Sequence, residues 1–183
     1  NKKIRVFQTS SNIGFGKANN FGASKAKGKY LYLLNEDTIL VNNACYFLFD
    51  FLENHPDASM ATSNLYTREM KPTSSFDINE RNLEQERKNA SLINMLSRKL
   101  TKRIGNAFNY SDHPYRIYGF AITASTLIVK KDFDAVGGFD KDIFLYSEDC
   151  LLCYNLIHLL KKEIWSVPSS KVIHLEGMAD KGK

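Results

Sequence analysis

The sequence contains only three cysteines and no long apolar segment. Cys45, Cys150 and Cys153 are too few for a disulfide framework, and so low a count is typical of a reducing compartment. No apolar run approaches the ~20 residues that a membrane-spanning helix needs, and no signal peptide is visible. We therefore expect a soluble chain that resides in the cytoplasm.

Three common cofactor motifs are also missing or incomplete. Cys150 and Cys153 form a CxxC pair, but no second pair and no nearby histidine complete a zinc site. Gly14 and Gly16 begin a dinucleotide-binding pattern, yet Asn19 stands where its third glycine belongs. A Gly-Lys-Ser/Thr phosphate loop does not occur. We therefore interpret the two cysteines of the pair as core-facing residues of a helix.

The positive charge is concentrated in one segment. The formal net charge is +5, and residues 81–103 contain seven basic residues against two acids, so that the rest of the chain is neutral. This distribution argues against a nucleic-acid-binding protein with a basic face throughout. Leu92, Ile93, Leu96 and Leu100 recur at helical spacing in this segment. The pattern predicts either a helix that lies on an anionic membrane or covers an acceptor groove, or an amphipathic helix packed on the domain.

Apolar periodicity alternates between strand and helix along most of the chain. A length of 183 residues with 43% hydrophobic composition fits a single domain with a buried core. Residues 67–115 break the alternation with polar loop and charged helix, and we interpret them as an insertion. The pattern predicts an α/β domain whose sheet is mixed but mostly parallel, with ligands at the carboxyl ends of the strands. We expect strands over 4–8, 30–35, 58–66, 123–131, 164–168 and 171–175, and helices over 16–26, 43–54, 133–136 and 149–161.

Two acids follow directly after the apolar run "YLYLL". Asn35, Glu36 and Asp37 stand at the point where this strand ends. Their side chains are therefore expected at the edge of the sheet, where oxygen ligands suit Mg²⁺ or Mn²⁺ bound together with substrate phosphates. The alternative is a strand-to-helix turn in which Asp37 or Thr38 serves only as an N-cap.

Two further polar groups precede or follow regular elements. Glu148 and Asp149 stand immediately before an apolar helix, so one can cap it while the other faces a cleft, or both can serve only in capping. His174 ends the last strand, where it is either a ligand or a histidine with a structural role at the edge. The glycine-rich stretch at Gly14 and Gly16 enters a helix, so it either offers free N–H groups to an anion or forms a tight turn.

Four motifs occur in a fixed order along the chain: "NIGFGKANNFG", "GKYLYLLNEDT", "LIVKKDFDAVGGFDKDIFLYSEDCLLC" and "VIH". In this order they resemble the family 2 glycosyltransferases, particularly the bacterial rhamnosyltransferase-like branch. The resemblance covers nearly the whole chain except the insertion. It implies a GT-A fold that here lacks its N-terminal strand or strands, because the first strand and turn of the family have no counterpart before Asn1.

The resemblance also implies a function. It predicts an inverting enzyme that uses Mg²⁺ or Mn²⁺ and moves a hexosyl or deoxyhexosyl group from a nucleotide-diphosphate sugar to a saccharide or lipid-linked saccharide acceptor. Such an enzyme would serve polysaccharide or glycan synthesis in the cytoplasm, in peripheral contact with the inner face of the membrane. The alternatives are a non-catalytic or degenerate nucleotide-sugar-binding fragment, and a nucleic-acid binder with steeply salt-dependent association.

Site residues follow from the motif matches alone. Asp149 matches the catalytic base of a Glu-Asp pair whose first member is Glu148. Asp37 matches the metal-binding acid at the strand end, and His174 matches a histidine near the metal and diphosphate. The predicted donor contacts are Asn12, Gly14, Gly16, Asn20, Asn35 and Glu36.

Three positions depart from the family pattern. Glu36 stands where many members have proline, and Leu151 stands where an acid usually follows the Glu-Asp pair. Leu175 replaces a second histidine that is common in the family. The nucleotide, the sugar and the acceptor are not predicted by these residues.

Overall fold

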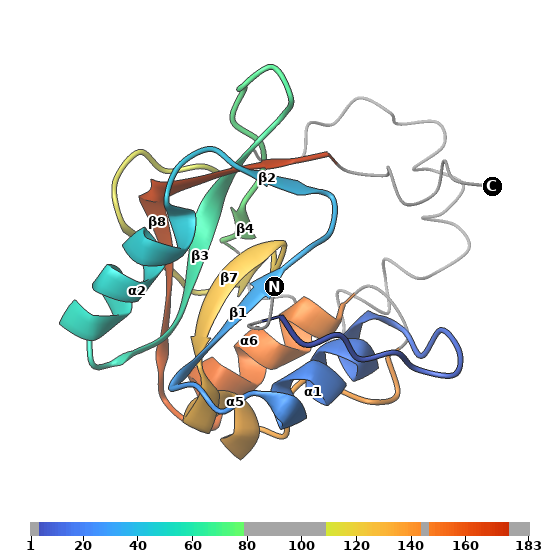
Figure 1. Ribbon diagram of the computed structural model, residues 1–183. Helices are drawn as coiled ribbons and strands as arrows, with labels where there is room; N and C mark the ends of the chain where they lie inside the picture. The colour runs from blue at the N-terminus through green and yellow to red at the C-terminus, as the bar shows by residue number, and fades with distance from the viewer. Residues whose placement is uncertain (1–3, 79–108, 144–146, 176–183) are drawn as a thin grey trace, which may run out of the picture.

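The computed structural model describes residues 4–78, 109–143 and 147–175, which form an α/β domain with helices on both faces of a central sheet (Figure 1). The helices are α1 (Phe15–Lys25), α2 (Ala44–Asn54), α5 (Lys130–Ala135) and α6 (Glu148–His158). The strands are β1 (Tyr30–Leu34), β2 (Thr38–Leu40), β3 (Ala58–Tyr66), β4 (Phe76–Asp77), β5 (Tyr115–Ile117), β6 (Phe120–Ala121), β7 (Ser125–Val129) and β8 (Glu163–His174).

The central sheet has the strand order β1-β7-β3-β8-β2, with β5 paired to β8 beside this path and β4 paired to β6 in a separate ribbon. The predicted α/β class is confirmed, but the predicted dominance of parallel strands does not hold among the described pairs. Only β3 and β8 are parallel; the other pairs are antiparallel. The prediction assumed a helical crossover after each strand. Instead, β7 lies between β1 and β3 and runs antiparallel to both, and β2 pairs antiparallel with β8.

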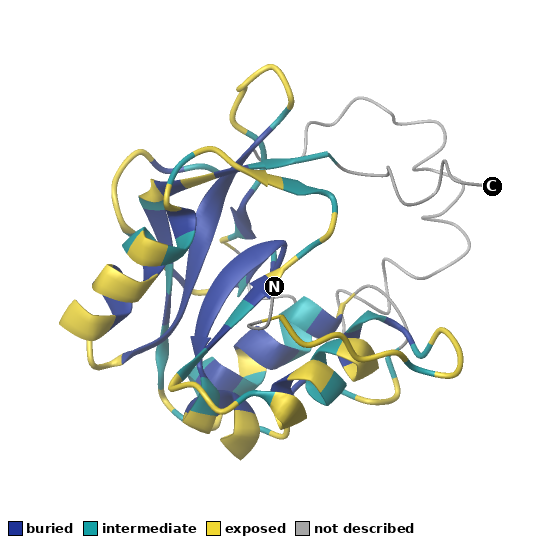
Figure 2. Ribbon diagram, in the orientation of Figure 1, coloured by how far each residue is buried: buried dark blue, intermediate teal, exposed yellow. Residues whose placement is uncertain are grey.

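The sheet separates two apolar layers. Helix α2 covers one face, and α1, α5 and α6 cover the other (Figure 1). Against α2, the core contains Leu48, Phe51 and Leu127, while Met60 and Leu156 belong to the core on the α6 side. All nine residues of β3 are buried because this strand is central and covered on both faces (Figure 2). Its polar residues Ser59, Thr62, Ser63 and Asn64 are therefore buried together with its apolar ones.

Three of the predicted strands differ from the structure. Residues 4–8 are not assigned to a strand, since they have no neighbouring strand in the described part of the chain, and Ile4 and Val6 are largely exposed. The two predicted strands over 164–168 and 171–175 are one strand, β8. Its register against β3 shifts between Ser63 and Asn64, so an irregularity absorbs Pro168 without ending the strand.

The flanks of the predicted insertion belong to the core. Phe76 of β4 is buried and stacks on Tyr115 with ring centroids 5.0 Å apart. Residues 79–108, which include the predicted basic helix, lie outside the described residues. Among the helices that are described, none combines the length and hydrophobicity that crossing a bilayer requires.

Candidate active site

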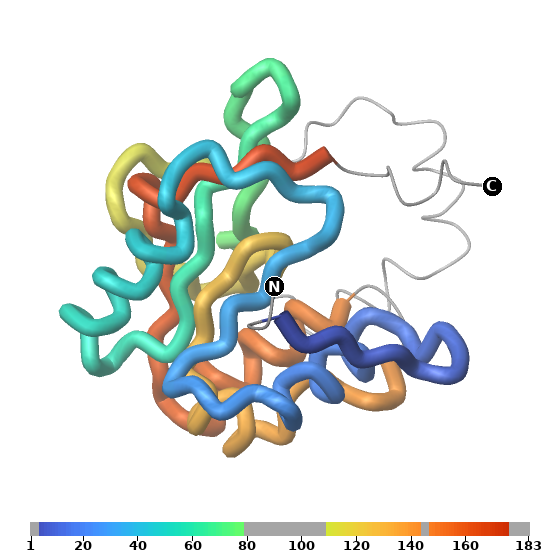
Figure 3. Tube along the Cα trace, in the orientation of Figure 1, coloured from blue at the N-terminus to red at the C-terminus, as the bar shows by residue number. Residues whose placement is uncertain are grey.

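Several strands end along one edge of the central sheet. This edge contains the carboxyl ends of β1, β3 and β8 and the first residues of β2 and β7. In Figure 3 the turn between β1 and β2 passes beside the end of β8. The pairing of Thr38 with His174 and of Tyr66 with Ile173 fixes three of these strand ends next to one another.

The turn at residues 35–37 is held by backbone hydrogen bonds. The N–H of Asn35 donates to the carbonyl of Ala124 at 2.9 Å, and the N–H of Leu175 donates to the carbonyl of Asp37 at 2.9 Å. The hydroxyl of Thr38 donates to the carbonyl of Asn35 at 2.6 Å. The alternative in which Asp37 or Thr38 caps a helix is wrong, because β2 follows the turn directly.

Asp37 and His174 face each other across this edge. Oδ1 of Asp37 lies 3.3 Å from Nε2 of His174, and the two side chains are only 16% and 13% exposed. The pair offers one oxygen and one nitrogen ligand. Within the described residues no third histidine, cysteine or acid joins them. A cation bound here would therefore take its remaining ligands from water and from substrate phosphate, which is how Mg²⁺ is usually held.

Asp149 lies in the first turn of α6 and is held by Thr123. The Thr123 hydroxyl donates to Oδ1 of Asp149 at 2.5 Å, and the Thr123 N–H approaches Oδ2 at 3.3 Å. Burial raises the pKa of the Asp149 carboxyl to about 6; the hydrogen bonds from Thr123 act in the opposite direction, and the nearby charge of Glu148 raises it further. A carboxyl with this pKa is a stronger base than an exposed aspartate and is still mostly ionised at neutral pH.

Glu148 is the more deeply buried member of the acid pair. Its side chain is 6% exposed, and its Oε2 atom has no hydrogen-bond partner among the described residues. Neither acid is the N-cap of α6, because Ser147 occupies that position with a left-handed backbone (φ 72°) and makes no capping bond through its side chain. The alternative that one of the two acids is merely this cap is therefore wrong.

The segment Thr123–Ala124 joins the two acidic positions. Thr123 binds Asp149, and the next residue, Ala124, accepts the hydrogen bond from Asn35 in the β1–β2 turn. Two predicted site residues, Asp149 and Asn35, are thereby linked through two consecutive residues of the chain. Sequence reasoning missed Thr123, because its contact with Asp149 spans 26 positions and no local motif marks it.

The glycine-rich stretch makes its described contacts elsewhere. Gly14 adopts φ 83° at the N-cap of α1, and its N–H donates to the side chain of Asn12 at 3.0 Å. A Cβ on Gly16 would lie 3.0 Å from Cβ of Phe139. The amide of Asn20 binds both backbone groups of Phe139, at 2.7 and 2.9 Å. These residues fasten α1 to the loop before α6, and their predicted contact with a donor stays a prediction.

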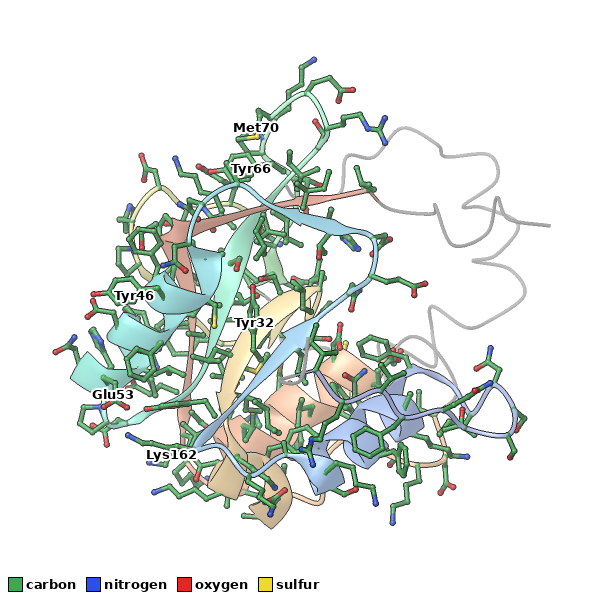
Figure 4. All side chains as sticks on the ribbon, in the orientation of Figure 1. Tyr32, Tyr46, Glu53, Tyr66, Met70 and Lys162 are labelled. Atoms are coloured by element: carbon green, nitrogen blue, oxygen red, sulfur yellow. The ribbon has the colours of Figure 1, made fainter. Side chains whose placement is uncertain are left out.

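A tyrosine pair stands at the same sheet edge and was also missed. Tyr66 ends β3, and its hydroxyl lies 3.1 Å from that of Tyr110. Figure 4 shows Tyr66 at the end of the sheet opposite α5. Burial raises the pKa of Tyr66 to about 12. Tyr66 therefore stays protonated at physiological pH and can donate a hydrogen bond, but it cannot serve as a base.

Cys153 is fully buried, as predicted, and its Sγ accepts a hydrogen bond from the N–H of Ala121 at 3.4 Å. Cys150 is partly buried. The three cysteines are free thiols.

Comparison with solved structures places this arrangement in a known fold. A crystal structure of GalNAc-T7 with UDP, GalNAc and Mn²⁺ superimposes with a TM-score of 0.62 at 17% sequence identity, covering 94% of this chain. The chain spans about a third (33%) of GalNAc-T7. A second structure, A197 from STIV, matches with a TM-score of 0.49 at 12% identity over 87% of this chain and 64% of its own. No curated protein matches the sequence. The first comparison confirms the predicted GT-A fold.

The N-terminal two thirds of the chain match a sequence family. The profile described as Glycosyl transferase family 2 matches residues 1–124. The matched part contains the glycine-rich stretch, the Asp37 turn and Thr123, whereas Asp149 and His174 follow it in sequence and reach the same edge through folding. The chain belongs to glycosyl transferase family 2.

Proposed function

We propose that this chain is the catalytic part of an inverting glycosyltransferase that moves a sugar from a nucleotide-diphosphate donor to a hydroxyl of a saccharide acceptor. The observation that supports this best is the linkage of Asp149, through Thr123 and Ala124, to the turn that presents Asp37. One edge of the sheet thus holds a candidate base and a candidate cation ligand on separate elements. Inverting transfer uses both groups. The acceptor hydroxyl loses its proton on one side of the anomeric carbon, while negative charge develops on the diphosphate that leaves from the opposite side.

Asp149 is proposed as the base. Its carboxylate accepts the proton of the acceptor hydroxyl as that oxygen attacks the anomeric carbon. Thr123 orients the carboxylate through the hydrogen bond at 2.5 Å. Oε2 of Glu148, buried beside it, is suited to accept a hydrogen bond from a second substrate hydroxyl.

Asp37 and His174 are proposed to hold Mg²⁺ or Mn²⁺. When bound, such a cation neutralises charge on the departing diphosphate. The short approach of the two side chains and their partial burial fit two adjacent positions of one coordination sphere. Asn35 and Glu36 are proposed to contact the donor beside them, and Asn12, Gly14, Gly16 and Asn20 to border it.

The finer assignment is also a proposal. We place the enzyme in the rhamnosyltransferase-like branch, with hexosyl or deoxyhexosyl transfer in polysaccharide synthesis, on the order and spacing of the four motifs. The neighbouring GalNAc-T7 structure contains UDP and Mn²⁺, which supports a nucleotide donor and a divalent cation for the fold. Contact with a lipid-linked acceptor or with a membrane rests on residues 81–103, which lie outside the described residues.

The test is calorimetry of the full chain with UDP, GDP and dTDP, each with and without Mn²⁺. We expect one diphosphate to bind more tightly when Mn²⁺ is present, and Asp37→Asn to weaken this Mn²⁺-dependent binding at least ~10-fold. Asp50→Asn is the matched control, because Asp50 is an exposed acid on α2. Absence of binding by all three diphosphates would contradict the transferase assignment. Binding without any turnover of the matching nucleotide sugar would favour the non-catalytic alternative.

A further inference from the structure

Residues 122–125 form a turn between β6 and β7, and the two central residues of this turn hold the candidate site together. Thr123 binds the carboxylate of Asp149, and the carbonyl of Ala124 accepts a hydrogen bond from the turn between β1 and β2. The conformation of the turn therefore sets where the Thr123 hydroxyl meets this carboxylate.

One buried hydroxyl lies against both ends of the turn. The hydroxyl of Thr62 donates to the carbonyl of Ile122 at 3.2 Å and to the carbonyl of Ser125 at 3.3 Å. A hydroxyl has one proton, so the two carbonyls share it, while the Thr62 oxygen accepts the hydroxyl of Thr126 at 3.1 Å. Thr62 is fully buried, so its hydroxyl cannot bind water instead. The first and last carbonyls of the turn thus depend on one side chain.

Strand pairing explains why Thr62 reaches the turn. Thr62 pairs with Thr126, and this is the last described pair between β3 and β7 before the site edge. Strand β7 begins one residue earlier, at Ser125, so the turn lies just beyond the end of the pairing. Side chains alternate along β3, and Met60, on the same face as Thr62, belongs to the core on the α6 side. Thr62 therefore lies on the face of the sheet that α6 covers.

The other described contacts at the ends of the turn use different atoms. The N–H of Ile122 donates to the carbonyl of Ser75 at 3.1 Å. The hydroxyl oxygen of Ser125 lies 2.8 Å from that of Ser63. These contacts hold the chain before and after the turn, but they leave the carbonyls of Ile122 and Ser125 to Thr62.

We propose that Thr62 is a positioning residue for Asp149, because its hydroxyl fixes the turn 122–125 and thereby holds Thr123 in place against the carboxylate. The role in catalysis rests on the proposed function, in which Asp149 is the base. Without the Thr62 hydroxyl the two carbonyls lose their shared donor and the turn relaxes. The hydrogen bond from Thr123 at 2.5 Å is then weakened, and the carboxylate loses its orientation.

The groups around Asp149 make its pKa a specific measure of this contact. Burial raises this pKa, the bonds from Thr123 lower it, and the charge of Glu148 raises it. No charged group of β6 or β8, the strands packed against α6, is among the described groups that shift it. The thiol of Cys153, also on α6, stays protonated because burial raises its pKa. Replacing the neutral Thr62 leaves these groups in place, so a rise in the pKa of Asp149 reports weaker bonds from Thr123.

Carbon-13 NMR titration of the Asp149 carboxyl in the full chain tests the proposal without turnover. The signal is assigned by its absence in Asp149→Asn. Thr62→Val keeps the shape of the side chain but removes the hydroxyl, so the pKa of Asp149 should rise above about 6. Thr62→Ser keeps the hydroxyl and should leave the pKa close to that of the wild type. In steady-state kinetics, Thr62→Val should lower kcat about tenfold with the KM for the donor unchanged.

The matched control is Thr126→Val. Thr126 is also fully buried and stands opposite Thr62, and its hydroxyl donates to Thr62 with only a longer approach, 3.4 Å, to the carbonyl of Ile122. The variant removes an equivalent buried hydroxyl but leaves the Thr62 proton on the two carbonyls. The pKa of Asp149 should therefore stay near about 6. An unchanged pKa in Thr62→Val, or an equal rise in Thr126→Val or in Thr62→Ser, would overturn the proposal.

One measurement needs no variant of Thr62. In the wild type its hydroxyl proton should exchange slowly with water, because it is buried and bound, and rapid exchange would overturn the proposal even if Thr62→Val failed to fold. If the pKa of Asp149 responds as expected while no nucleotide binds, the positioning by Thr62 stands and the transferase assignment fails. If sugar is transferred while neither the pKa nor kcat responds to Thr62→Val, the assignment stands and the role of Thr62 is overturned.

Discussion

The β1–β2 turn and the first turn of α6 each bring a carboxylate to the same edge of the sheet, but they surround it differently. Asp37 faces the imidazole of His174, a second group with a metal-binding atom. Asp149 faces the neutral hydroxyl of Thr123, and burial raises its pKa to about 6. The first setting favours sharing a cation, and the second favours taking up a proton. Two acids that look alike in sequence are thus suited to different chemistry by their neighbours.

The largest effect is expected from Asp149→Asn. The amide keeps the size of the side chain and can still accept the Thr123 hydroxyl bond, but it cannot take a proton. Turnover should fall at least ~100-fold with donor affinity nearly unchanged. Steady-state kinetics with the donor identified by calorimetry measure both quantities. A rate close to wild type would show that Asp149 has a structural role only. Glu148→Gln should reduce turnover less or act on acceptor affinity.

A smaller and different effect is expected from Asp37→Ala. Loss of this ligand should lower Mn²⁺-dependent affinity for the nucleoside diphosphate by at least ~10-fold, because one of two protein ligands is removed. Affinity without metal should change little. Calorimetry at several Mn²⁺ concentrations separates the two. If Asp37→Ala instead lowered turnover at unchanged affinity, the contrast between the two carboxylates would be wrong.

Thr123→Val sharpens the comparison through pH. The Thr123 hydroxyl stabilises the ionised carboxylate, so its loss should raise the pKa of Asp149 above about 6. In the wild type, kcat/KM should rise as pH increases through about 6, where the base loses its proton. In Thr123→Val this rise should occur at higher pH. If kcat/KM rose over the same pH range in the variant as in the wild type, a group other than Asp149 would control this rise. Thr126→Val is the control, as Thr126 bonds to Thr62 and not to Asp149.

Sequence patterns correctly predicted the elements whose burial can be recognised from their own residues. The strand over 58–66 was located correctly because every residue of it is buried, and the helix over 43–54 because its apolar residues follow one face. The prediction of a strand over residues 4–8 was wrong. A strand needs a neighbouring strand to pair with, and the sequence of five residues does not show whether one is present. Strand direction failed for the same reason, because it depends on how distant segments meet.

The site shows the same division. The acids at 35–37 and 148–149 could be found because they end or begin apolar elements. Thr123 and Tyr66 could not, since a single hydroxyl at a strand end has no distinctive spacing, and their importance comes from partners 26 and 44 positions away. The resemblance to a family identified the order of the motifs along the chain. The contacts between their residues at the sheet edge are seen only in the structure.

The smallest expected effect concerns stability. Because the pKa of Asp149 is raised from 3.8 to about 6 in the folded chain, the folded state binds this proton more tightly than the unfolded state. The associated stabilisation is fully present below pH 4 and is lost as pH rises through about 6. Asp149→Asn cannot ionise, so at pH 7.5 it should raise the free energy of unfolding by at most about 3 kcal/mol and the Tm by at most about 10 °C. At pH 4 the two proteins should unfold at nearly the same temperature. Thermal unfolding at both pH values, with Asp50→Asn as the exposed control, makes the comparison. An equal gain at both pH values would show that relief of packing strain, and not loss of a buried charge, stabilises the variant, and the argument that Asp149 is held as a ready proton acceptor would lose its support.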